Sequence, residues 1–117
     1  MTSLDELFTD PYLPEVGDVY WVATEILDAY DIEPRRPAVV VLVPATLDGR
    51  ITVVTRTTRP GIPGVPHDPD PNLGLRKPGT FFYVRTAEAR LWKRPHVEWM
   101  GTLDEEVLRL IIEDRLG

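Results

Sequence analysis

The chain has 117 residues, the length of one ordinary domain, and it contains no cysteine. Disulfides, thiolate metal sites and a cysteine nucleophile are therefore excluded, which suits the reducing cytoplasm where we expect the protein to act. The formal net charge is −6, but acids crowd residues 3–33 and 98–114 while bases dominate residues 35–94. This basic middle could present a local positive surface to a nucleic acid, although a well-mixed surface is an equal alternative.

The sequence shows no feature that predicts export or membrane insertion. Its first ten residues, MTSLDELFTD, are acidic and lack a long apolar run, so they do not predict a signal peptide. No apolar stretch approaches the ~20 residues that a transmembrane helix needs. We expect no membrane association.

The first predicted element is a short N-terminal helix. Residues 3–6 (SLDE) form a capping box, and Leu4, Leu7 and Phe8 give one apolar face. Two prolines follow and would end the helix. We therefore divide the chain into a helical extension, residues 1–14, and a main domain, residues 15–117, and expect the apolar face to dock on that domain or across a dimer.

Strand-forming segments follow one another through the middle of the chain. Residues 19–23, 38–43 and 50–57 are rich in β-branched and aromatic residues, and Asp48-Gly49 predicts a hairpin turn between the last two. Residues 24–36 are predicted to form a polar loop. Residues 59–79 carry half of the prolines and four glycines, which indicates a long surface loop within one domain.

The remaining segments are predicted to be strands and a final helix. Residues 80–84 and 96–100 favour strands, and residues 86–92 form a second, ambiguous element. Thr102 to Glu105 reads as a capping box before a helix with apolar residues at helical spacing. Since strands and helices do not alternate, we predict a mainly β fold: an antiparallel, partly closed barrel with a C-terminal helix and a short N-terminal helix.

Three segments, in this order, resemble the MazF/PemK (Kid) family of toxins. They are Gly-Asp-Val-Tyr-Trp-Val at 17–22, Arg-Arg-Pro-Ala-Val-Val-Val at 35–41, and the strand that starts at Ile51 and ends in Thr57-Thr58. Residues 74–80 (GLRKPGT) and 100–103 (MGTL) resemble further family motifs less closely. The resemblance covers about residues 16–116.

The resemblance implies an SH3-like barrel, a homodimer, and cleavage of single-stranded RNA without a metal or other cofactor. It also implies a cognate antitoxin whose acidic tail occupies the RNA groove. Such cleavage needs a proton acceptor for the 2′-hydroxyl, a cation for the charge that develops on the phosphate, and a donor for the leaving oxygen. An arginine suits the second role, because its planar fork matches phosphate oxygens and stays charged.

Arg36 and Thr57 occupy the positions of the family's catalytic arginine and threonine. If strands 38–43 and 50–57 pair through the Asp48-Gly49 turn, both residues lie at the same end of the barrel. The alternative for Arg36 is a structural ion pair with an acid of the preceding loop. That loop offers three candidates for the proton acceptor, and spacing favours Asp31 over Asp28 and Glu33, although the family's common Gly-x-Glu pattern is missing.

Five further residues are predicted to contact RNA: Arg35, Arg56, Thr58, Trp92 and Lys93. Arg56 and Thr58 alternate to the strand face opposite Thr57. Trp92 lies among bases and is the best candidate for base stacking, whereas packing is expected for Trp21 and Trp99.

The two histidines, His67 and His96, have a suitable intrinsic pKa for acid–base catalysis but no identifiable partner. With only two histidines and no cysteine, a zinc site is improbable. The alternative function is a catalytically inactive barrel that acts by binding a protein partner. The net acidity, the altered loop and the extra N-terminal helix favour it, because a shared fold does not fix activity.

Overall fold

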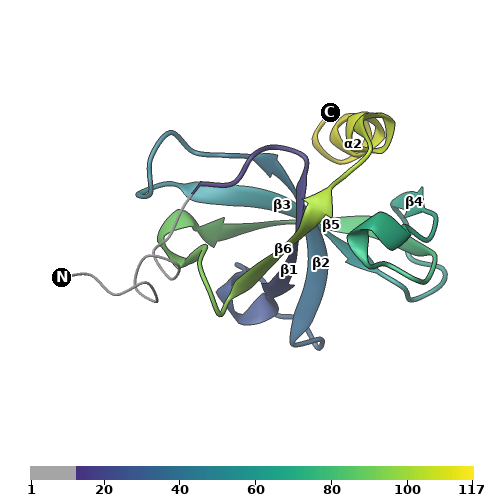
Figure 1. Cartoon of the computed structure of the whole chain (residues 1–117), viewed down its shortest axis with the longest axis horizontal. Coiled ribbons are helices and arrows are strands. Elements are labelled where there is room, and N and C mark those ends of the chain that lie inside the picture. The colour runs from purple at the N-terminus through teal and green to yellow at the C-terminus, as the bar shows by residue number, and fades with distance from the viewer. Residues whose placement is uncertain (1–12) are drawn as a thin grey trace.

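The computed structural model describes residues 13–117, in which six strands form one antiparallel sheet in the order β4-β5-β3-β2-β1-β6. The strands are β1 (Asp18–Ala23), β2 (Arg35–Leu42), β3 (Arg50–Thr57), β4 (Val65–His67), β5 (Gly79–Glu88) and β6 (Val97–Thr102). The C-terminal helix α2 (Glu105–Ile111) continues as a wider turn over Ile112–Leu116. Figure 1 shows the sheet curled into a half-barrel, with α2 and β4 at its periphery. The predicted mainly β barrel with a C-terminal helix is confirmed.

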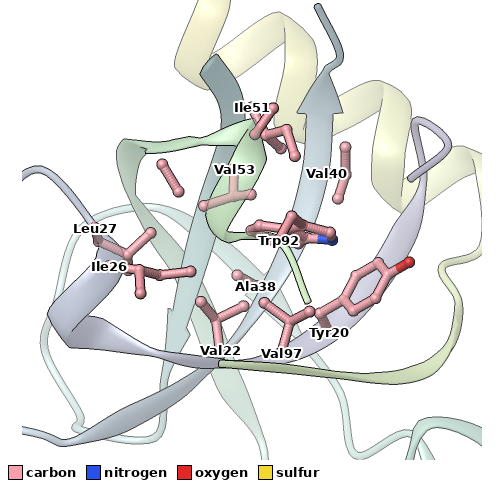
Figure 2. Packing of buried hydrophobic residues seen from close by; sticks show 12 residues of the cluster. Tyr20, Val22, Ile26, Leu27, Ala38, Val40, Ile51, Val53, Trp92 and Val97 are labelled. Atoms are coloured by element: carbon pink, nitrogen blue, oxygen red, sulfur yellow. The ribbon is translucent and has the colours of Figure 1, made fainter. Parts of the chain in front are cut away.

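Side chains on the two faces of the curled sheet build two separate hydrophobic clusters. On the inner face, Tyr20, Val40 and Val53 pack with Trp92, as Figure 2 shows. On the outer face, Val39 and Val54 belong to a cluster that includes residues of β4 and α2. Since both faces are covered, β2 can be apolar at successive positions instead of alternating with polar residues.

Several predicted elements differ from those observed. The second strand begins at Arg35 rather than after the proline, so both arginines lie within β2. The segment predicted as a polar loop contains a short 3₁₀ turn, Thr24–Ile26, and the proline-rich segment contains β4 and a second 3₁₀ turn, Pro71–Leu73. The two elements predicted over 80–92 are one long strand, β5, followed by a 3₁₀ turn at Ala89–Leu91.

The start of the final helix also differs from the prediction. Thr102 belongs to β6, where its neighbour across the ladder is Asp18. The helix is capped by Asp104, whose carboxylate accepts hydrogen bonds from the amides of Glu106 and Val107 at 3.0 and 3.3 Å. The predicted N-terminal helix lies outside the described residues. Within residues 13–117, no helix is long and apolar enough to cross a membrane.

Candidate functional site

The sheet register brings the predicted catalytic residues to one end of the barrel. Ala38 of β2 pairs with Thr55 of β3 in an antiparallel ladder. Arg36 lies two residues before this pair on β2, and Thr57 lies two residues after it on β3, so both lie at the same end of the ladder. Both side chains line the same groove, as expected from the hairpin.

Arg36 is held by a buried carboxylate. Its Nε donates to Oδ2 of Asp31 at 2.6 Å, and NH1 of Arg85 donates to the same oxygen at 2.7 Å. The other oxygen, Oδ1, accepts the amide of Glu33 at 2.9 Å. The Asp31 side chain is only 1% exposed, against 15% for Arg36. Two guanidinium groups therefore share one carboxylate, and the cluster of Asp31, Arg36 and Arg85 carries a net positive charge.

These partners also determine the ionisation of Asp31. Burial by itself would raise the pKa of this carboxyl, but the hydrogen bonds from Arg36 and the Glu33 amide, with the charges of Arg36 and Arg85, outweigh burial and hold the pKa below its ordinary value. A carboxylate with a lowered pKa and occupied oxygens is a weak proton acceptor. The arrangement suits Asp31 to holding the arginines rather than to taking a proton.

The guanidinium of Arg36 keeps part of its donor capacity for a ligand. Asp31 engages only the Nε of Arg36, and the two terminal amino groups donate no hydrogen bond to any of the described residues. Its plane lies over the ring of Phe82, with the guanidinium carbon 5.3 Å from the ring centroid. Arg36 thus has a fixed side chain with free N–H donors at its end.

Thr57 ends β3 opposite Thr80 of β5 and is 6% exposed. Its hydroxyl oxygen accepts the backbone amide of Arg59 at 3.1 Å. This bond fixes the position of the oxygen, while the hydroxyl hydrogen has no acceptor among the described residues. The hydroxyl can therefore donate to an anionic ligand beside Arg36.

A groove of about 600 Å³, called here the basic groove, opens at this end of the barrel. Its cationic lining residues are Arg35, Arg36, Arg56, Arg59, Arg76 and Lys77. Thr57, Thr58 and the half-exposed Trp21 also line it. Glu33 is the one acidic residue among the described residues that form the lining. A groove with this lining would attract phosphate groups.

Three of the residues predicted to contact RNA line the basic groove in different ways. Thr58 is exposed there. Arg35 is half-buried and donates to the carbonyl of Pro95 at 2.9 Å. Arg56 is 2% exposed: its Nε donates to Nδ1 of His67 at 3.0 Å, and its NH2 donates to the carbonyl of Lys77 at 2.7 Å. Arg56 therefore anchors the proline-rich segment, and this placement does not favour a direct contact with RNA.

The other two predicted RNA contacts do not reach the groove. Trp92 is 0% exposed and packs edge-on against Tyr20 in the inner cluster, with ring centroids 5.1 Å apart (Figure 2). The prediction that Trp92 stacks on a base is wrong, because no face of its indole is accessible. Lys93 lies in the segment before β6 and is absent from the groove lining.

Neither histidine lies in the groove. His67 is buried, and its Nε2 is 3.4 Å from the carboxylate of Asp70. His96 is 3.8 Å from the carboxylate of Glu25. Within the part of the chain that the structure describes, no group of three or more potential ligand side chains gathers to hold a metal ion.

The role of Arg85 as a partner of Asp31 was not predicted from the sequence. This arginine occupies β5 on the inner face, as the alternation with Ala87 of the inner cluster indicates, and it is 5% exposed. A charged residue at an inward-facing position of an apolar strand was the available signal, because such a residue needs a buried partner. That partner, Asp31, comes from a loop far away in the sequence and could not be identified from spacing.

Of the comparisons with known proteins, the one with solved structures identifies the fold. No protein-family model matches the sequence, and no curated protein matches it either. Among solved structures, MazF from Deinococcus radiodurans superposes with a TM-score of 0.65 at 20% identity, over 87% of this chain and 92% of that one. MazF in a MazE–MazF complex from the same organism gives a TM-score of 0.61 at 21% identity, over 87% and 90%. The chain therefore has a MazF-like fold.

Proposed function

We propose that this chain with a MazF-like fold is a growth-inhibiting toxin that cleaves single-stranded RNA without a metal ion. The single observation that carries the proposal is the convergence of Arg36 and Thr57 in a groove lined by further cations. A fixed guanidinium and a fixed hydroxyl are the donors that a phosphate needs as negative charge develops on it. The groove also gives the acidic chain a local positive surface.

The ion pair between Arg36 and Asp31 is compatible with this role. A phosphate oxygen would meet the terminal amino groups of Arg36, which the pair leaves free, and would not have to displace the carboxylate. The net positive charge of the Asp31, Arg36 and Arg85 cluster remains to stabilise an anion. Since the guanidinium is held by Asp31 and Phe82, little side-chain entropy is lost on binding.

We propose three partners for this chain: an RNA substrate, an antitoxin and a second copy of the chain. Single-stranded RNA is the substrate class, since its phosphates and unstacked bases suit a groove with arginines and an exposed tryptophan. The solved MazE–MazF complexes suggest that a MazE-like antitoxin neutralises this chain, and we propose that it acts as a homodimer in the cytoplasm.

The test is cleavage of a long single-stranded RNA by purified protein in EDTA. Arg36→Ala should lower the cleavage rate by about 10²–10³-fold, because one donor to the developing charge is lost. Arg90→Ala is the matched control, since Arg90 is exposed in the 3₁₀ turn after β5 and lies outside the groove lining. It should cleave as the wild type does.

Growth on induced expression separates the two candidate functions. A nuclease toxin should lose growth inhibition in Arg36→Ala together with cleavage. If the wild type does not cleave RNA and Arg36→Ala still stops growth, the nuclease proposal is overturned. The acting surface would then be one that binds a protein partner.

A further inference from the structure

The carboxylate of Glu33 is free within the basic groove. The residue is exposed and lines the groove with Arg36 and Thr57. Among residues 13–117, no hydrogen bond or ion pair engages its side chain. Its carboxylate oxygens therefore have lone pairs available to a ligand in the groove.

The backbone of Glu33 is nevertheless fixed on both sides. Its amide donates to Oδ1 of Asp31 at 2.9 Å, and its carbonyl accepts the hydroxyl of Thr24. The next carbonyl, that of Pro34, accepts the amide of Thr24 at 2.9 Å. These bonds hold the loop against the 3₁₀ turn that follows β1, so the Glu33 side chain starts from a defined position three residues before Arg36.

Asp31 lacks the properties that a proton acceptor in this groove needs. Its side chain is 1% exposed, its two oxygens accept three hydrogen bonds, and it is absent from the groove lining. A general base must reach the proton that it removes with a free lone pair. Of the three loop acids, Asp28 is also occupied, because its carboxylate accepts the amide and the hydroxyl of Thr86 at 3.0 and 3.1 Å.

We propose that Glu33 is the general base of the RNA cleavage proposed above and that Asp31 is a positioning residue. This inference rests on the proposed nuclease function. A Glu33 oxygen takes the proton of the 2′-hydroxyl, and the 2′-oxygen forms a bond to phosphorus. The bond from phosphorus to the 5′-oxygen breaks, and that oxygen takes a proton from water. Glu33 returns its proton to the resulting hydroxide, and the products are a 2′,3′-cyclic phosphate and a 5′-hydroxyl.

A negative side chain would otherwise weaken the binding of RNA to this groove. The charged groups that line the groove with Glu33 are Arg35 and Arg36 of β2, Arg56 and Arg59 at the end of β3, and Arg76 and Lys77 before β5, while the carboxylate of Asp31 lies at the Glu33 amide. These cations can hold the phosphates despite one carboxylate. If Glu33 only repelled RNA, its neutralisation would strengthen binding and leave the rate at saturating RNA unchanged or raised.

The experiment compares single-turnover cleavage of a saturating single-stranded RNA in EDTA from about pH 3.5 to 7, a range that includes the pH near 4 at which free carboxyl groups titrate. The wild-type rate should rise with pH up to a plateau, as a base in its deprotonated form requires. Glu33→Gln should cleave about 10²–10⁴-fold more slowly at the plateau and should lack this rise. Asp31→Asn should cleave more slowly but keep the rise.

Glu25→Gln is the matched control, because Glu25 is an exposed acid of the same loop outside the groove lining. Its pH profile should equal that of the wild type. Wild-type cleavage with an unchanged profile in Glu33→Gln would overturn the inference alone, and so would loss of the rise in Asp31→Asn with its retention in Glu33→Gln. Absence of cleavage by the wild type would overturn the proposed function as well.

Discussion

Asp31 neutralises only half of the positive charge that surrounds it. Oδ2 accepts from both Arg36 and Arg85, and Nε of Arg85 has no partner in the described part of the chain. The guanidinium of Arg85 lies over the ring of Tyr83, 4.8 Å from its centroid, which offsets part of the cost of burial. This local excess of positive charge favours an anionic ligand at Arg36, the member of the cluster that lines the groove.

The buried imidazole of His67 accepts a hydrogen bond from a cationic side chain, that of Arg56. Nδ1 accepts from Nε of Arg56 and so needs its lone pair, which protonation would remove. Burial first, and then the charge of Arg56, lower the pKa of His67, although Asp70 and Asp68 act in the opposite direction. The neutral form is thus favoured in the folded protein.

This arrangement predicts that stability falls on mild acidification. Above about pH 6.5 His67 is neutral in both states and contributes no pH dependence. Below that, the unfolded chain binds a proton that folded His67 resists, so the free energy of unfolding decreases as the pH falls, by up to about 1.4 kcal/mol per pH unit. Urea unfolding from pH 7 to 5 measures this slope.

The slope should be smaller in His67→Gln than in the wild type, and His96→Gln, which removes a partly exposed imidazole, is the matched control. Asp28 and Asp31 also have lowered pKa values, but their contributions are lost only as the pH falls toward 3.8 and below. An equal slope in the wild type and in His67→Gln would contradict the prediction.

Individual strands were predicted best where local pattern and tertiary environment agree. β3 was predicted over residues 50–57 and is observed as Arg50–Thr57, because β-branched residues fill it and a turn precedes it. β5 was split in two because Arg85-Thr86 interrupts its apolar pattern. In the structure, Asp31 accepts a hydrogen bond from the Arg85 guanidinium, and Asp28 accepts one from the Thr86 amide. Both polar residues therefore have partners, and the strand continues.

The start of α2 offers a test of the corrected cap. Asp104→Ala should lower the free energy of unfolding by about 1 kcal/mol, because the amides of Glu106 and Val107 lose their acceptor. Thr102→Ala, which removes the residue that the sequence predicted as the cap, should cost less, since Thr102 is exposed at the end of β6. Chemical denaturation of both variants measures the difference, and a larger loss in Thr102→Ala would refute the assignment.

At the scale of the whole molecule, the basic groove gathers cationic side chains in one place, although the chain as a whole has more acidic than basic residues. If RNA neutralises roughly three to four charges there, the logarithm of its association constant should fall with the logarithm of salt concentration with a slope of about −2 to −3. Fluorescence titration with a 2′-O-methyl RNA, which lacks the nucleophile, measures this slope without cleavage.

Two lysines provide the matched comparison for this slope. Lys77→Gln should make it less steep by about 0.7, as expected for one lost phosphate contact to a single strand. Lys93→Gln should leave it unchanged, because Lys93 does not line the groove. The opposite pattern would place the RNA elsewhere on the molecule.

The candidate site could be predicted from the sequence only in part. Arg36 and Thr57 were found because a short hairpin aligns them, so spacing along the chain translates directly into position. Trp92 was misjudged because its basic neighbours are local, whereas its burial depends on contacts with strands distant in sequence such as β1. The division of roles that we propose for Asp31 and Glu33 likewise depends on Arg85, from another strand.

The walls of the groove come from Trp21 of β1 and from three longer segments that the chain keeps far apart: residues 32–37 at the start of β2, the end of β3 and the proline-rich segment before β5. A ligand in the groove would touch all three at once and restrain their opening together. Amide hydrogen exchange should then slow in concert in these segments on binding, while the amides of α2 exchange at an unaltered rate.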